Sequence, residues 1–148
     1  MDRIEPHAAA GVTREKLETI ASVHERWNEA LRNKDVDAAI ALYAPDTVLE
    51  SPLVRHLIKS KEGIVRGREK LREFVTMVFA NQPASRRTYR KGFFTDGHTL
   101  MWEYPRAAPD GDQMDFVEVM EIENGLIAYH RVYWGWYGLR ILEENRHH

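Results

Sequence analysis

Residues Met114 to Leu139 read MDFVEVMEIENGLIAYHRVYWGWYGL, and they give the clearest indication of the fold. Apolar and polar residues alternate along it, the alternation stops at Glu123-Asn124-Gly125, and it then resumes. A period of two is typical of strands that bury one face, and a break that contains glycine is typical of a hairpin turn. The sequence therefore predicts two antiparallel strands joined by a tight turn.

The alternation also predicts which residues of this hairpin face the core. They are Met114, Phe116, Glu118, Met120 and Ile122 in the first strand, and Leu126, Ala128, His130, Val132, Trp134 and Trp136 in the second. If a three-residue turn pairs Ile122 with Leu126, antiparallel counting places Glu118 opposite His130. An acid and an imidazole that face each other among apolar residues predict a chemical site.

Composition excludes several classes of function. At 148 residues, with 43% hydrophobic and 30% charged residues, the chain fits one globular domain. Its formal net charge of −2 does not attract nucleic acid or an anionic membrane, and no apolar run approaches the roughly 18 residues of a membrane span. Cysteine is absent and the start of the chain lacks a signal-peptide pattern, so we expect a cytoplasmic protein. The histidines lack the paired spacing of a metal site, so we expect neither metal nor cofactor.

Periodicity orders the rest of the chain into helices followed by strands. Residues 1–12 are expected to be a flexible leader and residues 13–148 a single domain. Helices are expected at 13–33, 35–44 and 67–82, and strands at 47–51, 86–94, 99–104, 114–123 and 126–137. Three N-terminal helices inside a curved antiparallel sheet give a cone-shaped α+β fold, and the mouth of such a cone accepts small molecules.

Three segments resemble a known family. The stretch WNEALRNKDVDAAIALYAPDTVLESP, from Trp27 to Pro52, resembles the opening of bacterial ketosteroid isomerases. Gly67-Arg68-Glu69 resembles the start of their third helix, and FVEVMEIENGLIAYHRVYW resembles their last hairpin. The chain is thus similar to the nuclear transport factor 2-like superfamily, which also includes SnoaL-like polyketide cyclases and limonene epoxide hydrolases. This resemblance implies the fold but not one function, because the superfamily hosts many chemistries and some non-catalytic binders.

The catalytic positions of ketosteroid isomerases are only partly retained. Those enzymes use an Asp base, a Tyr donor and a protonated Asp. The resemblance places Ser51 at the base, Trp27 at the Tyr and Glu118 at the protonated Asp. Because a serine cannot shuttle a proton between two carbons as a carboxylate does, we expect no ketosteroid isomerase activity. One acid of the epoxide hydrolases falls on Val132, which disfavours that chemistry too.

His130 and Glu118 remain as the candidate catalytic pair. The alternative is a structural role, with His130 bonded to Glu118 in the core, or with Glu118 bonded to Arg131 or Arg106. An ionised carboxylate without a partner costs several kcal/mol in apolar surroundings, so Glu118 is either paired or protonated. A neighbouring carboxylate favours a charged imidazole and burial opposes it, so the sequence leaves the protonation states open.

The other candidates would form an apolar pocket around this pair. They are Trp27, Tyr43, Ser51, Trp102, Phe116, Met120, Val132 and Trp134. Their indole rings favour a flat, apolar ligand. The alternative is that the aromatic residues are ordinary core, with Tyr43 packing a helix. The basic segment 52–67, which includes Arg55 and His56, is either a lid over the cone or a solvated loop.

Three functional hypotheses follow. The first is a cofactor-independent enzyme that transfers protons in an isomerisation, cyclisation or dehydration of an apolar cyclic carbonyl compound. The second is a non-catalytic module of the same fold that binds a small ligand or a partner. The third is a water-activating hydrolase.

The outer face of the last hairpin predicts self-association. It would carry Val117, Val119, Ile127, Tyr129 and Tyr133, which is too apolar for a solvent face. We therefore expect a homodimer formed through the sheet.

Overall fold

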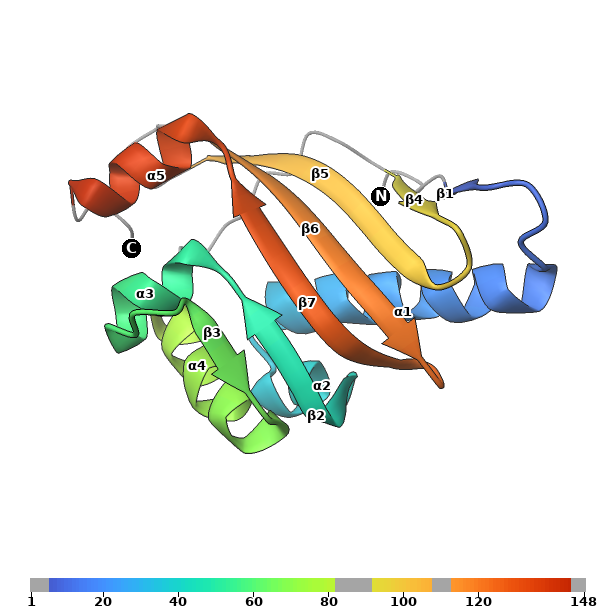
Figure 1. The fold of residues 1–148 in the computed structure, drawn as a ribbon, viewed down its shortest axis with the longest axis horizontal. Coiled ribbons are helices and arrows are strands. Elements are labelled where there is room, and N and C mark those ends of the chain that lie inside the picture. Colours follow the sequence, from blue (N-terminus) through green and yellow to red (C-terminus); the bar gives the residue numbers. More distant parts are fainter. Residues whose placement is uncertain (1–5, 82–91, 108–112, 145–148) are drawn as a thin grey trace.

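A seven-stranded curved sheet wraps around the helices in the computed structural model, which describes residues 6–81, 92–107 and 113–144 (Figure 1). The strands are β1 (Pro6–Ala8), β2 (Tyr43–Glu50), β3 (Ile64–Arg66), β4 (Phe93–Thr95), β5 (Thr99–Ala107), β6 (Gln113–Glu123) and β7 (Leu126–Trp134). The helices are α1 (Arg14–Asn33), α2 (Val36–Ile40), α3 (Pro52–Ile58), α4 (Arg68–Asn81) and α5 (Trp136–Glu143). The predicted α+β class is confirmed.

The sheet has the order β1-β4-β5-β6-β7-β2-β3. Strands β4 to β7 form an antiparallel meander, whereas β2 runs parallel to β7 and β1 runs parallel to β4. The sheet is therefore mixed and not purely antiparallel as expected. The parallel pairing of β2 with β7 brings the early part of the chain beside the last hairpin.

Helix α1 lies behind β5, β6 and β7 in Figure 1 and fills the hollow of the sheet. It begins as the sequence predicts, since the Thr13 side chain accepts a hydrogen bond from Lys16 N, and it ends at Lys34 in the left-handed conformation (φ 52°). Its buried face includes Ile20, Val23 and Trp27. The core therefore lies between this face and the concave side of the sheet.

The hairpin turn is shorter than expected. Asn124 (φ 52°) and Gly125 (φ 76°) alone form it, because two consecutive residues with positive φ make a type I′ turn. Glu123 therefore pairs with Leu126. The register then shifts by one residue, and Ile127 is completely buried although alternation placed Leu126 and Ala128 inward.

This shift also changes the pairing of the two ionisable residues. His130 lies opposite Met120, and Glu118 lies opposite Val132. The predicted direct pairing of Glu118 with His130 is wrong. The two remain diagonal neighbours on the same face, and a diagonal pair on adjacent strands is within reach of long side chains.

Several element boundaries also differ from expectation. Tyr43 begins β2 and does not lie on the second helix, which ends at Ile40. The segment expected to be a loop is α3 followed by β3, and Pro6–Ala8 of the expected leader is β1. The last strand stops at Trp134, so Trp136 lies on α5 with 75% of its surface exposed and not in the core.

Most of the strand expected at 86–94 lies outside the described residues. No helix within 6–81, 92–107 or 113–144 is both long and apolar enough to cross a bilayer.

Candidate functional site

Five side chains from five elements form one buried chain of hydrogen bonds. Trp27 Nε1, on α1, donates to the Tyr43 hydroxyl, on β2, at 3.2 Å. The Tyr43 hydroxyl lies 2.8 Å from His130 Nδ1, on β7. His130 Nε2 lies 2.8 Å from Glu118 Oε1, on β6, and the Tyr104 hydroxyl, on β5, donates to Glu118 Oε2 at 2.7 Å. Each of the five residues is at most 7% exposed.

The backbone holds Tyr43 at the start of its strand. Its carbonyl oxygen accepts hydrogen bonds from the guanidinium of Arg68, at the beginning of α4. Farther along β2, Leu49 is in register with His130. The first contact ties the start of β2 to α4, and the second holds β2 beside β7. Together they place the Tyr43 hydroxyl next to the imidazole.

Donor and acceptor accounting assigns the protons of this chain. Because an indole only donates, the Tyr43 oxygen accepts from Trp27, and its own proton is left for His130 Nδ1. The imidazole is then neutral, carries its proton on Nε2 and donates it to Glu118. The carboxylate accepts from His130 and Tyr104, as an ionised group does.

Burial shifts the pKa values of Tyr43, which belongs to this hydrogen-bonded chain, and of His24, which does not. The pKa of Tyr43 is raised far above its usual value by burial, which outweighs the opposing hydrogen bond from Trp27, and the nearby charge of Glu118 raises it further. Burial also lowers the pKa of His24 to about 4, against the attraction of Glu118. Tyr43 therefore keeps its proton at neutral pH, and His24 is neutral.

A cavity opens beside the hydrogen-bonded chain. The centre of a water molecule could occupy a volume of about 90 Å³ inside it, whereas a single bound water needs roughly 10–15 Å³ on the same measure. Its wall includes the predicted residues Trp27, Tyr43, Ser51, Phe116, Glu118, His130, Val132 and Trp134. The cavity is therefore large enough for an organic ligand and has ionisable groups in its wall.

Two predicted pocket residues lie behind the cavity wall. Trp102 packs edge-on against Trp27, with ring centres 5.2 Å apart, and does not line the cavity. Met120 is completely buried opposite His130 and does not line it either. Trp102 therefore packs against one wall residue, Trp27, and Met120 lies beside another, His130, on the neighbouring strand.

The expected lid residues are also outside the cavity wall. Arg55 and His56 lie on α3 and do not line the cavity. Ser51 caps this helix by accepting a hydrogen bond from Leu53 N at 3.2 Å, and the Leu53 side chain lines the cavity. The segment is thus a capped helix with one side chain in the wall, and a role as a lid stays a prediction.

Sequence reasoning missed Tyr104 and the apolar residues of the wall that come from other elements. The missed apolar residues include Leu49, Leu53, Phe74 and Phe79. Tyr104 follows Trp102 by two residues on β5, so strand alternation places both on the inner face. That spacing was the available signal for Tyr104, whereas nothing in the sequence distinguishes the wall residues of α4 from ordinary core.

The described residues do not gather three or more side chains of the kinds that hold a metal ion. The chemistry that the arrangement supports on its own is proton transfer. An imidazole between a tyrosine hydroxyl and a carboxylate can take up a proton at one nitrogen while its other nitrogen stays bonded to the acid.

The fold is shared with solved nuclear transport factor 2-like proteins. Similar solved structures include an NTF2-like protein of unknown function from Mesorhizobium loti (21% identity, TM-score 0.67, covering 89% of this chain and 99% of that one). Another is a putative ketosteroid isomerase from Kribbella flavida (18%, 0.61, 80% and 78%), and a third is TerC co-crystallized with polyporic acid (16%, 0.67, 85% and 98%). At these identities the similarity shows the fold alone.

The sequence gives a narrower family assignment than the similar structures do. The SnoaL-like domain matches residues 24–130, and the chain belongs to this family. The superfamily resemblance seen in the sequence is thereby confirmed. No curated protein matches the chain.

Proposed function

We propose that this protein is a cofactor-independent acid/base enzyme that isomerises, cyclises or dehydrates an apolar cyclic carbonyl compound. The observation that carries the proposal is the hydrogen-bonded chain from Tyr43 through His130 to Glu118 at the wall of an apolar cavity. A histidine flanked by a hydroxyl and a carboxylate is suited to accept a proton from one partner and return it, because the carboxylate stabilises the charged ring.

Tyr43 is the group that contacts the substrate in this proposal. Both nitrogens of His130 are already bonded within the protein, so the imidazole meets the substrate only through the tyrosine hydroxyl. The C–H bond next to the carbonyl breaks, its proton goes to the Tyr43 oxygen, and the Tyr43 proton passes to His130 Nδ1. The resulting imidazolium is stabilised by the Glu118 carboxylate.

The reverse transfer completes the reaction. The proton returns through Tyr43 to another carbon in an isomerisation, to the departing hydroxyl in a dehydration, or to the new alkoxide in a cyclisation. Because burial raises the pKa of Tyr43, a free tyrosinate is unfavourable. This supports a concerted relay, in which the hydroxyl gains one proton as it releases the other.

Ser51 is the candidate donor to the developing enolate. It lines the cavity, is 6% exposed and accepts a hydrogen bond from Leu53 N. Its own proton has no acceptor among the described residues. The resemblance to ketosteroid isomerases places the catalytic base at this position, but here the serine would donate a hydrogen bond to the substrate oxygen.

A ligand-binding module without catalysis is the second candidate. The specific observation in its favour is that the buried hydrogen-bonded chain is satisfied within the protein. TerC, co-crystallized with polyporic acid, is a protein of this fold crystallised with a ligand. The hydrolase hypothesis has no comparable observation in its favour.

Exchange of carbon-bound hydrogen separates the two candidates. A panel of cyclic ketones such as 2-tetralone is incubated with the protein in D₂O, and loss of the C–H signals next to the carbonyl is followed by NMR. Exchange above the buffer rate that falls at least about tenfold in Tyr43→Phe and His130→Gln supports the enzyme. Binding without faster exchange, or equal rates in the variants, supports the binding module. Glu121→Gln, on the outer face of β6, is the matched control.

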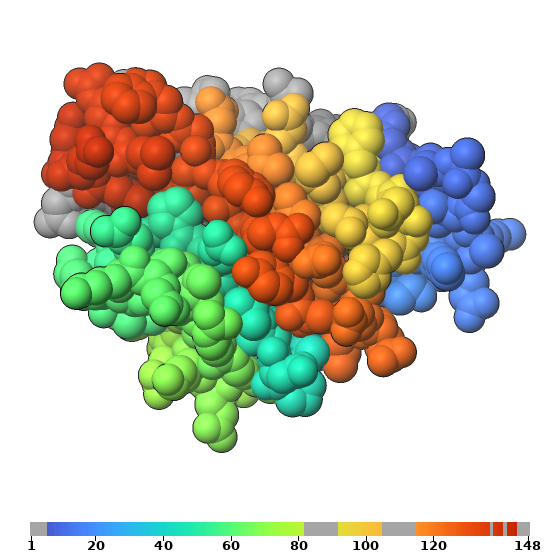
Figure 2. Space-filling model, viewed as in Figure 1, coloured from blue at the N-terminus to red at the C-terminus, as the bar shows by residue number. Residues whose placement is uncertain are grey.

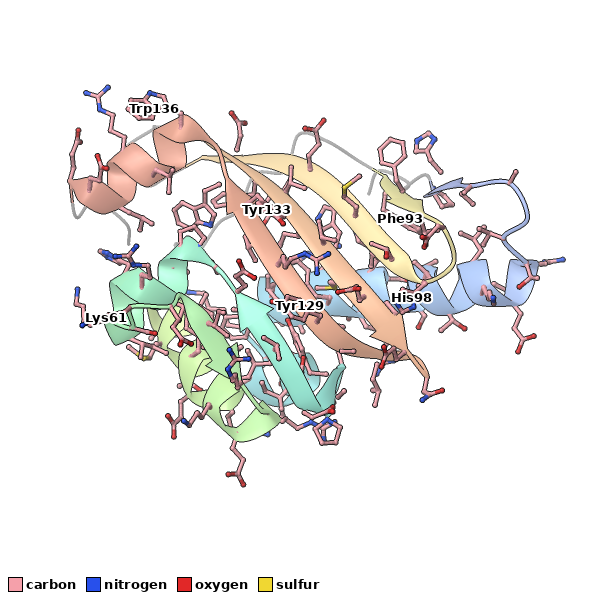
Figure 3. All side chains as sticks on the ribbon, in the orientation of Figure 1. Lys61, Phe93, His98, Tyr129, Tyr133 and Trp136 are labelled. Atoms are coloured by element: carbon pink, nitrogen blue, oxygen red, sulfur yellow. The ribbon has the colours of Figure 1, made fainter. Side chains whose placement is uncertain are left out.

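We also propose that two copies associate through the outer face of the sheet. Figure 2 shows that no described helix covers the outer face formed by β5, β6 and β7. Figure 3 shows Tyr129 and Tyr133 on this face. Tyr133 is 54% and Met101 42% exposed. Ile127, expected here, is instead in the core, and an Arg131–Glu121 ion pair of 2.7 Å makes this face more polar than predicted.

A further inference from the structure

We infer that the cavity selects uncharged ligands, and that Glu118 is the residue that excludes the carboxylate counterpart of an otherwise acceptable ligand. This inference rests on the proposed function for its choice of a carbonyl ligand. It concerns binding only, so it can be tested without knowledge of the reaction.

The described part of the cavity wall contains no lysine or arginine. The guanidinium of Arg68 donates to the carbonyl oxygen of Tyr43, a wall residue, but Arg68 itself does not line the cavity. The other polar groups in the wall are hydroxyls, an imidazole and indole N–H groups, and none of these carries a full positive charge in the assigned protonation state. An anion in this cavity would therefore lack a cationic partner.

The negative charge of Glu118 is not cancelled by its neighbours. The residue is 3% exposed, and its two oxygens accept hydrogen bonds from His130 and Tyr104. A charged imidazole would need both of its nitrogens to donate. The Tyr43 oxygen would then accept from Trp27 and His130, and its proton would have no acceptor among the described residues. With Glu118 ionised, the arrangement that gives each of these protons an acceptor has a neutral imidazole, and the cavity wall then carries a net charge of −1.

Such a charge discriminates strongly between ligands of the same shape. Two like charges roughly 7 Å apart, at an effective dielectric constant of about 20, weaken binding by roughly 50-fold. Loss of the carboxylate's hydration in an apolar cavity adds to this effect. A ketone has no charge for Glu118 to repel and loses less hydration on binding. It can also accept a hydrogen bond from a wall hydroxyl such as that of Ser51.

A matched pair of probes tests the inference. The probes are 2-acetylnaphthalene and 2-naphthoate, which share a flat ring system and differ in an uncharged acetyl group and a carboxylate of similar size. Affinities are measured at pH 7.5 by calorimetry, and shifts of the Trp27 indole N–H signal report binding in the cavity. We expect the ketone to bind at least about 30-fold more tightly, and the carboxylate to compete poorly for the same site.

Glu118→Gln identifies the source of the selectivity. The side chain keeps its shape, and its amide oxygen can still accept the proton on His130 Nε2 while its amide nitrogen faces the Tyr104 oxygen, so the protonation of His130 need not change. The ratio of the two affinities should fall at least about fivefold, because binding of 2-naphthoate improves while binding of the ketone changes little. Glu121→Gln makes the same substitution three residues along β6 on the outer face and should leave the ratio unchanged.

Three results would overturn the inference: no shift of Trp27 with the ketone, a carboxylate that binds within about threefold of it, or an unchanged ratio in a folded Glu118→Gln protein. The comparison in the unmodified protein remains decisive even if the variant does not fold. Selective binding of the ketone without exchange of its hydrogens would support this inference and contradict the proposed enzyme, so the two failures are distinguishable.

Discussion

The Tyr43 hydroxyl lies 2.8 Å from Nδ1 of His130, a residue 87 positions farther along the chain. The contact exists because β2 and β7 are parallel neighbours, and it joins the strand that follows α1 and α2 to the last strand along the chain. Through His130 it connects Tyr43 to Glu118, which is the relationship on which the proposed function depends.

Tyr43→Phe should destabilise the protein by about 1–3 kcal/mol. The substitution keeps the ring but leaves the Trp27 N–H and His130 Nδ1 buried without their partner. Urea unfolding followed by circular dichroism measures the change. Tyr129→Phe is the matched control, because it removes a hydrogen bond to Glu50 that is exposed, and it should cost less than about 0.5 kcal/mol. Equal effects of the two variants would contradict a buried hydrogen-bonded chain.

His130 should carry a single proton on Nε2, with Nδ1 accepting from the Tyr43 hydroxyl. The assignment follows from Trp27 donating to Tyr43, which leaves the tyrosine proton for Nδ1. Long-range ¹H–¹⁵N spectra distinguish a protonated from an unprotonated ring nitrogen. A signal from two protonated nitrogens would show an imidazolium and reverse the assignment. In Tyr43→Phe, the Nδ1 signal should move because its hydrogen bond is lost.

Stability should fall as the pH is lowered from about 6.5 toward 4. His24 is 3% exposed and burial lowers its pKa to about 4, so between these values the unfolded state binds the proton and the folded state does not. The loss attributable to His24 is at most about 3 kcal/mol and levels off below pH 4. Unfolding free energies across this range should depend less steeply on pH in His24→Gln. An unchanged slope would exclude His24 as the source.

Gly138→Ala should destabilise α5 even though alanine favours helices by about 1 kcal/mol. A Cβ at Gly138 would lie 2.8 Å from Cε3 of Trp134, whose side chain lines the cavity. Either the helix or the indole must shift, and such overpacking costs about 1–3 kcal/mol. A double-mutant cycle with Trp134→Leu measures the coupling. The alanine should cost less, or become favourable, once the indole is removed; additive effects would show that the contact does not matter.

The particle mass in solution should be twice the 17.3 kDa of one chain, as measured by light scattering. Tyr133→Glu and Met101→Glu each place a charge on the outer face of the sheet and should shift the mass toward the monomer. Met77→Glu, at an exposed position of α4, should leave it unchanged. A monomer at every concentration would refute association through the sheet.

Much of the architecture could be predicted because it depends on local patterns. Thr13 and Asp35 cap their helices as the sequence indicates, and the strand alternation around Glu118 is observed. The predicted element boundaries are wrong where two local sequence patterns favour different structures at the same residues. At Asn124-Gly125 a two-residue turn replaces the expected three-residue turn, and at Gly135 a helix begins where the strand pattern continues into Trp136.

The candidate site was predicted in part for the same reason. Glu118 and His130 stand out because each is ionisable on an apolar face, and the structure brings their side chains together despite the wrong register. Tyr43 was expected on a helix, and Tyr104 was not singled out. Their roles depend on contacts among β2, β5, β6 and β7, which periodicity along one segment cannot reveal.

Local patterns along the sequence are enough to predict the class of fold, the family and the two ionisable residues of the inner face, because capping, alternation and residue type act over a few neighbouring positions. The tertiary structure alone decided that Tyr43 bonds to one side of His130 and Glu118 to the other, and that these groups border a cavity. The physical reason is that strand order and register in the sheet are set by packing between distant segments, and a shift of one residue changes which side chains meet.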